Sequence, residues 1–217
     1  NSIQVYPKLP LGVSGFVART ASTQAAFTLQ FNQQFEPGAK VLKFMYRSSS
    51  AAYRLRMQTG DLLWESELQG DDGSQGSSRM VEISVPQLLD VIRFDIVNTD
   101  PKPEDAFELY GLSIENKTPG VTYHNLGVGG AAYGALRSQA YFEAQSSLLA
   151  PDLVILDWGT NDLIYKNTVP EQLESTIVET IRKVRAEHPD ALIVLTSVQD
   201  TYFRKQPITA TWEFAQL

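Results

Sequence analysis

Apolar and polar residues alternate along the first half of the chain, from about residue 12 to residue 115. A period of two is typical of strands that bury one face and leave the other in water. Turn signals such as EPG at residues 36–38 and GD at residues 60–61 separate the segments, and residues 70–78 predict an exposed hairpin loop. We therefore predict an antiparallel β-sandwich. Its apolar positions are Phe27, Leu29, Phe31, Leu42, Phe44, Tyr46, Tyr53, Leu55, Met57, Val81, Ile83, Val85, Ile92, Phe94, Ile96, Leu112 and Ile114.

The periodicity changes after residues 116–120, which have the sequence NKTPG. Residues 121–126 predict a short strand, and the glycine-rich residues 127–130 predict a turn. Residues 131–149 place apolar side chains three and four positions apart, which predicts one amphipathic helix that ends before Pro151. Strand, turn and helix in succession are typical of an α/β domain.

An unbroken apolar run, LVIL at residues 153–156, follows this helix and is bounded by proline and glycine. Such a run is typical of a strand buried on both faces inside a parallel sheet. Thr168 and Glu171 form a capping box, which predicts the start of another amphipathic helix. Residues 191–196 then predict a second buried strand. Strand, helix and strand at this spacing predict a right-handed parallel crossover.

We therefore expect two domains. Residues 1–118 would form the antiparallel β-sandwich, and residues 119–217 would form part of a three-layer α/β domain built on a parallel sheet. The chain begins at Asn1 without a methionine and ends at Leu217 inside a predicted helix. We interpret it as a fragment of a longer protein.

The composition excludes several classes of function. The 217 residues include 43% hydrophobic and 20% charged residues, as in an ordinary globular protein. A formal net charge of -7 argues against a nucleic-acid partner, which would favour basic patches. No run of 18 or more apolar residues occurs, so no transmembrane helix is expected. The lack of cysteine excludes thiolate chemistry, and two histidines are too few for a histidine-rich metal site.

Groups able to stabilise a negative charge follow two of the predicted strands. Asn161 lies in the GTND sequence of residues 159–162, at the carboxyl end of the LVIL strand, where ligands of α/β sheets bind. The backbone N–H of Gly130 lies at the start of a predicted helix and would favour developing negative charge. Two alternatives stay open: Asn161 could only satisfy turn backbone, and the glycines of residues 127–130 could only allow close packing.

Both motifs resemble those of a known family. GTND at residues 159–162 is similar to the third conserved block, G-x-N-D, of the SGNH (GDSL-like) hydrolases, and residues 125–130 (NLGVGG) resemble the second block. The resemblance covers residues 121–217 and is greatest to periplasmic peptidoglycan O-acetylesterases, in which a β-rich module interrupts the hydrolase domain between its first and second blocks. It implies that the Asn161 side chain and the Gly130 backbone N–H are oxyanion-hole donors.

The resemblance also implies a serine ester hydrolase, in the periplasm or outside the cell, that needs no metal and no cofactor. Its substrate would be an O-acetylated cell-wall or other polysaccharide, or another small ester. The family's G-D-S and D-x-x-H blocks are not found in these 217 residues, so no nucleophile or base is assigned and the chain alone is expected to be inactive. The alternatives are a non-catalytic carbohydrate-binding or structural protein on a degenerate SGNH scaffold, and a lipase or thioesterase of the same family.

Several other polar and aromatic residues have structural interpretations. We expect Asp162 to order its turn, His124 to be a strand residue beside the second motif, and His188 to be a surface residue at the end of a helix. Large aromatic residues in a β-rich domain are more often core than sugar-stacking platforms. The residues in question are Trp64, Tyr110 and Trp212.

Overall fold

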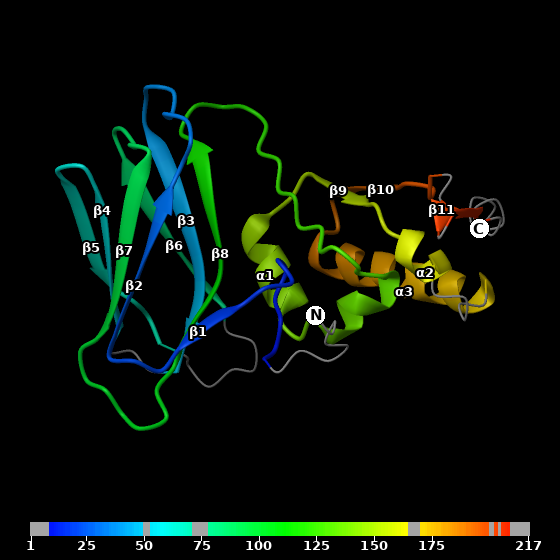
Figure 1. Cartoon of the computed structure of the whole chain (residues 1–217), viewed down its shortest axis with the longest axis horizontal. Coiled ribbons are helices and arrows are strands. Elements are labelled where there is room, and N and C mark those ends of the chain that lie inside the picture. Colours follow the sequence, from blue (N-terminus) through cyan, green and yellow to red (C-terminus); the bar gives the residue numbers. More distant parts are fainter. Residues whose placement is uncertain are drawn as a thin grey trace. The chain divides into compact units, whose positions relative to one another are not determined.

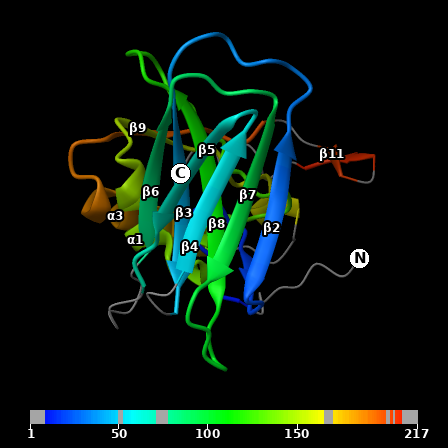
Figure 2. The same ribbon diagram turned by 90° about the vertical axis from the view of Figure 1, so that its left-hand side faces the viewer.

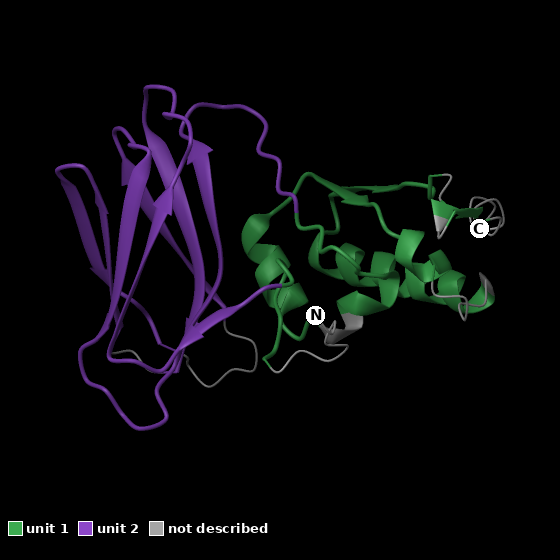
Figure 3. Cartoon of the chain, in the orientation of Figure 1, with its two compact units in different colours: residues 1–15, 126–217 green, residues 16–125 purple. Residues whose placement is uncertain are grey.

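The computed structural model describes residues 9–49, 53–70, 78–164, 170–199, 202–203 and 205–208. The chain divides into two compact units (Figure 3). Unit 1 comprises residues 1–15 and 126–217, and unit 2 comprises residues 16–125. The start of the chain therefore groups with the second half, and unit 2 interrupts unit 1 in the sequence. The predicted capping residue Thr168, Trp212 and residues 71–77 of the predicted loop lie outside the described residues.

Unit 2 consists of two antiparallel sheets (Figures 1 and 2). Within the described residues each sheet has four strands, in the orders β1-β8-β3-β6 and β2-β7-β4-β5. The predicted antiparallel strands are thus confirmed. The strands are β1 (Ala18–Thr20), β2 (Gln24–Gln30), β3 (Lys40–Ser48), β4 (Tyr53–Thr59), β5 (Leu62–Glu67), β6 (Arg79–Val85), β7 (Val91–Asn98) and β8 (Phe107–Asn116).

The alternation of the sequence explains the core of unit 2. In β4 every second side chain is buried, whereas the intervening side chains are wholly or partly exposed. Phe44 of β3, Leu55 of β4 and Phe94 of β7 are fully buried in one cluster that draws on both sheets. The Phe44 and Phe94 ring centroids lie 5.6 Å apart. Burial of such apolar area is the main stabilising contribution to a unit of this kind.

Strands β1 and β5 were not predicted from the sequence. β5 forms a hairpin with β4 in which Thr59 pairs with Leu62, so Gly60 and Asp61 form a two-residue loop. Gly60 has φ +55, and a positive φ at the first loop position suits glycine. The GD sequence at residues 60–61, predicted only as a turn between strands, is the loop of a β-hairpin. Trp64 of β5 packs partly buried against the core.

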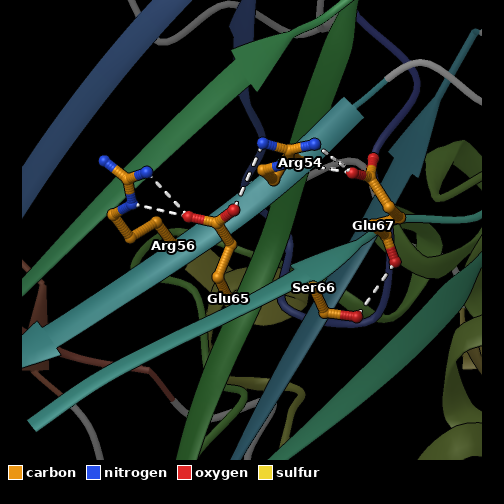
Figure 4. Close-up of polar contacts among 5 residues, drawn as sticks. All are labelled: Arg54, Arg56, Glu65, Ser66 and Glu67. Atoms are coloured by element: carbon orange, nitrogen blue, oxygen red, sulfur yellow. Dashed lines mark hydrogen bonds and ion pairs between the residues drawn. The ribbon is translucent and has the colours of Figure 1, made fainter.

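The outer face of this hairpin carries charged pairs that follow the strand register (Figure 4). Arg54 lies opposite Glu67 and Arg56 lies opposite Glu65. Arg54 Nε donates to Glu67 Oε1 and Arg56 Nε to Glu65 Oε2, each at 2.8 Å. Because these side chains are exposed, the pairs contribute little to stability. β5 is the edge strand of its sheet. Charged side chains on an edge strand disfavour pairing with a strand of another chain.

Unit 1 contains a parallel strand pair joined by a helix. β9 (Leu153–Leu156) pairs in parallel with β10 (Leu192–Leu195), and α3 (Pro170–Glu187) connects them (Figure 1). The predicted strand–helix–strand segment is therefore present. Pro170 opens α3, where a missing backbone donor costs nothing. The other elements are η1 (Tyr133–Ser138), α1 (Phe142–Leu149), α2 (Thr160–Ile164), β11 (Tyr202–Phe203) and β12 (Gln206–Pro207).

Two predicted elements of the second half of the chain are wrong. Residues 121–126 form no strand, because no strand in the described residues pairs with them; Val121 is 98% exposed. The single helix expected at residues 131–149 is divided into η1 and α1. The division has a clear cause: the Tyr141 backbone N–H donates to Leu11 O at 3.1 Å, a partner outside the helix.

The predicted burial of both faces of the parallel strands is also wrong. Leu153 and Ile155 of β9 are 48% and 50% exposed, and their partners on the same face, Leu192 and Val194, are 70% and 45% exposed. The described part of this sheet has two strands only, and it contains no layer that covers this face. Leu156 is buried, so the opposite face does contribute to the core.

Two further expectations concern histidines. His124 lies in the irregular segment before the second motif and not in a strand. His188 is 8% exposed and so is buried, not a surface residue. The cationic contact expected of it at the end of α3 is made by Arg185, whose Nη1 donates to the carbonyls of Pro189 and Ala191 at 2.8 and 2.6 Å.

The segment before unit 2 is tied to α1 by a buried glutamine. Gln145 is fully buried, and its Oε1 accepts the backbone N–H of Val13 at 3.0 Å. Gly12 passes so close that a Cβ there would overlap Gln145 Oε1, and a Cβ on Gly15 would overlap Val128. The chain before unit 2 is therefore packed against α1 and against the second motif, both of which follow unit 2 in the sequence.

We expect Gly12→Ala to destabilise unit 1 by about 1–3 kcal/mol, because the methyl group displaces Gln145 and breaks its bond to Val13. Chemical denaturation measures the change. Gly134→Ala is the matched control, since a Cβ at this exposed position meets nothing within 4 Å. Equal stability of the two variants would contradict the close approach of Gly12 to Gln145.

Candidate active site

The GTND motif begins just before α2, at Gly159, and continues into its first turn. Gly159 has φ +113, a conformation that favours glycine, and its carbonyl accepts the backbone N–H of Leu163 at 3.1 Å. This bond begins a helical turn, so Asn161 and Asp162 lie in a short helix and not in an open turn. Both residues follow the carboxyl end of a parallel strand, the edge at which α/β sheets bind ligands.

Asn161 reaches the residue that directly follows the second motif. Its Nδ2 donates to the carbonyl oxygen of Ala131 at 2.8 Å, across 30 positions of sequence. Ala131 directly follows Gly130, so the two predicted site residues come from segments that touch. The amide nitrogen of asparagine carries two hydrogens, and this bond uses one of them. The second can serve another acceptor.

The second motif is a tight turn that requires glycine. The backbone N–H of Ala131 donates to Val128 O at 3.0 Å, which places Gly129 and Gly130 at the two central positions. Gly130 has φ +85. A positive φ at the second central position defines a type II turn, for which glycine is preferred. Gly130 is exposed, so solvent or a ligand can approach it.

Asp162 is buried beside the same segment. It is 8% exposed, and its Oδ2 accepts the backbone N–H of Tyr133 at 3.1 Å. Burial raises the pKa of the Asp162 carboxyl, and hydrogen bonds from backbone N–H groups only partly offset this effect. The expectation that Asp162 orders its turn agrees with the hydrogen bond from its own backbone N–H, and its contact with the Tyr133 N–H extends this role to the segment after the second motif.

Tyr133 anchors the second motif in the core of unit 1. It is fully buried, lies in a cluster with Leu173 and Ile177 of α3, and meets Trp158 edge-on at a centroid distance of 5.4 Å. Burial, with the charges of Asp162 and Asp157 adding to it, raises the Tyr133 pKa to about 12, so the phenol is neutral at physiological pH. From the sequence, Tyr133 was predicted only to be an apolar position of a helix.

Asn161 contacts the residue that follows Gly130, so the segments that carry the two predicted oxyanion donors touch. No group of three or more histidine, aspartate or glutamate side chains suited to a metal ion occurs among these residues. Tyr110 is buried, which favours its core interpretation over a sugar-stacking platform. None of the described helices is long and apolar enough to cross a membrane.

Residues 100–216 match the family model of the GDSL-like lipase/acylhydrolases. The match spans more than half of the chain, and the chain therefore belongs to this family of ester hydrolases, as the GTND and NLGVGG motifs predict. No curated protein matches the sequence.

Solved structures provide a further comparison. A peptidoglycan O-acetylesterase shares the fold with a TM-score of 0.71 at 18% identity, over 95% of this chain and 55% of that one. The chain thus spans little more than half the length of that protein. A family two carbohydrate esterase from Cellvibrio japonicus matches 93% of this chain and 83% of its own at 13% identity, with a TM-score of 0.27. A carbohydrate-binding module of lichenase 5A from Cellvibrio mixtus matches 44% of this chain and 71% of its own at 10% identity, with a TM-score of 0.30.

The buried carboxyl predicts a pH dependence of stability. Because the pKa of Asp162 is higher in the folded state than in the unfolded state, unfolding releases a proton between the two values. The stability that this group contributes is complete below about pH 4 and is lost as the pH rises through the folded pKa. We expect the free energy of unfolding of Asp162→Asn, relative to that of the unsubstituted chain, to increase as the pH rises from about 4 to 7.

Chemical denaturation at several pH values measures this difference. Asp152→Asn, which alters an exposed carboxyl group of the same unit, controls for the loss of one charge. A difference between Asp162→Asn and the unsubstituted chain that stays constant with pH would contradict the buried, proton-binding Asp162.

Proposed function

We propose that the complete protein removes O-acetyl groups from a cell-wall or other polysaccharide, in the periplasm or outside the cell, through a serine acyl-enzyme. One observation carries this proposal: the Asn161 Nδ2–Ala131 O hydrogen bond of 2.8 Å, which joins the two family motifs beside Gly130. Family membership supports ester hydrolysis. The polysaccharide substrate and the location are inferred from the resemblance to peptidoglycan O-acetylesterases.

The proposed chemistry assigns one task to the described residues. A serine oxygen attacks the acyl carbon, and the electron pair of the carbonyl double bond moves to its oxygen. The second N–H of the Asn161 amide and the N–H of Gly130 stabilise this alkoxide. When the alkoxide collapses, the carbon–oxygen bond to the sugar breaks and the sugar oxygen takes the serine proton through a base. Water then attacks the acyl carbon of the acyl-enzyme. The same two N–H groups stabilise the second alkoxide, whose collapse releases acetate and returns the proton to the serine oxygen.

The serine, and the base with its acidic partner, would come from the complete protein, since the 217 residues contain neither the G-D-S nor the D-x-x-H block. Two donors fixed in advance stabilise the transition state more than the ground state, because the oxygen becomes negative only after attack. No metal or cofactor has a role in this mechanism.

We propose the finer fold together with the function. Unit 2 would be a carbohydrate-binding-like β-sandwich inserted between the first and second hydrolase blocks, and unit 1 would be part of a three-layer α/β domain. The position of unit 2 between residues 15 and 126 supports insertion. The parallel pair of β9 and β10, connected through α3, supports the α/β arrangement.

We expect Asn161→Ala in the complete protein to lower kcat by roughly 10²–10³-fold, equivalent to about 3–4 kcal/mol, with little change in KM. Asn161→Asp is expected to be at least as harmful, because a carboxylate repels the developing charge. Hydrolysis of p-nitrophenyl acetate and acetate release from O-acetylated peptidoglycan are the assays. Thr160→Ala, an exposed neighbour in the same turn, is the matched control.

An Asn161→Ala enzyme within a few-fold of the unsubstituted enzyme would refute the oxyanion role. The 217-residue chain alone should show only background hydrolysis. A complete protein that lacks esterase activity but binds polysaccharide would favour the non-catalytic alternative, and a preference for long acyl chains would favour a lipase or thioesterase.

A further inference from the structure

Two neighbouring side chains of α2 contact the segment just after the second motif at two points. Asn161 Nδ2 donates to the carbonyl of Ala131 at 2.8 Å, and Asp162 Oδ2 accepts the N–H of Tyr133 at 3.1 Å. The two backbone groups flank Ala132. The motif is thus held by one donor and one acceptor that lie next to each other in the sequence.

The backbone conformation of Ala132 explains why the two contacts fit. Its φ of -112° and ψ of 169° are those of an extended residue. In an extended chain, the carbonyl before a residue and the N–H after it point to the same side, which is how one strand bonds to a parallel neighbour. The side chains of Asn161 and Asp162 therefore make the two hydrogen bonds that the backbone of a parallel neighbouring strand would make to this stretch.

This pairing holds the end of the turn that contains Gly130. The Ala131 N–H closes the turn on Val128 O, while the Ala131 carbonyl bonds to Asn161. On the far side of Ala132, Tyr133 is fully buried. Rotation of the peptide groups between Gly130 and Tyr133 is consequently restricted from both ends. The Gly130 N–H belongs to the peptide group that precedes them, inside the turn that the Ala131 N–H closes, so its direction follows from how that turn is held.

Burial favours the protonated over the charged form of the Asp162 carboxyl group. Burial of a carboxylate opposes folding unless hydrogen bonds compensate for the lost hydration, and the raised pKa of Asp162 indicates incomplete compensation. A buried carboxyl group that keeps this cost of ionisation while it bonds the Tyr133 N–H is typical of a functional site.

We propose that Asp162 is a positioning residue of the oxyanion hole, which orients the Gly130 N–H by holding the Tyr133 N–H while Asn161 holds the Ala131 carbonyl. This inference rests on the proposed ester-hydrolase function. Asp162 contacts neither substrate nor reacting atoms in this role. Its contribution is geometric, because an oxyanion donor must stay within about 0.5 Å of its productive position.

The test compares three substitutions in the complete protein. Asp162→Ala removes the acceptor and is expected to lower kcat by about 10–100-fold with KM nearly unchanged. Asp162→Asn removes the charge but retains an oxygen acceptor, so kcat should stay within about threefold of the unsubstituted enzyme. Leu173→Ala is the control for general loosening, since it creates a cavity in the Tyr133 cluster and leaves both hydrogen bonds in place.

Amide hydrogen exchange provides a readout that does not depend on activity. Asp162→Ala should speed exchange of the Ala131 and Tyr133 N–H groups at least tenfold, whereas Asp162→Asn should leave it within about threefold. If the unsubstituted protein shows this protection but no esterase activity, the proposed function fails and the positioning contact stands. If Asp162→Ala does not fold, Asp162→Glu replaces it, because the added methylene displaces the acceptor.

Three results would overturn the inference. The first is an Asp162→Ala enzyme with unchanged kcat and unchanged exchange. The second is an Asp162→Asn enzyme, folded and protected, that loses as much kcat as Asp162→Ala, because the charge and not the acceptor would then matter. The third is an equal loss of kcat in Leu173→Ala, which would assign the effect to general loosening of the cluster.

Discussion

The hydrogen bond from Asn161 Nδ2 to the Ala131 carbonyl is the contact on which the site depends. It joins the connection after β9 to the turn that contains Gly130, and these segments lie 30 positions apart. Both segments are short, and each gains a fixed partner in the other. The turn needs positive φ at Gly130, and α2 is only a single short helix. Because Tyr133 is anchored in the core, the turn and the strand end form one structure.

The motifs were more predictable than the sheet that carries them. Asn161 and Gly130 could be selected because amide and glycine chemistry at a strand end is visible in the sequence. The contact between Asp162 and Tyr133 could not be predicted, because a pattern of apolar positions says nothing about a polar partner for the Tyr133 backbone. The alternation of β4 and β7 predicted strands and their buried faces well, because side-chain direction in a strand follows the sequence directly.

The failures in the second half of the chain share a physical cause. Residues 121–126 and the LVIL strand were predicted from local sequence, yet strand formation and burial require partners that local sequence does not supply. In the same way, the helix expected at residues 131–149 is interrupted because Tyr141 bonds to Leu11. Local propensity predicted each segment, and contacts distant in the sequence decided its structure.

The most direct test is a structure of the complete protein with a phosphonate bound covalently to its nucleophilic serine. The phosphoryl oxygen takes the place of the alkoxide formed during ester hydrolysis. We predict that this oxygen lies about 2.7–3.1 Å from both Asn161 Nδ2 and the Gly130 backbone nitrogen, with the Asn161–Ala131 bond intact. An adduct oxygen bound by other donors, with Asn161 and Gly130 out of its reach, would contradict the account.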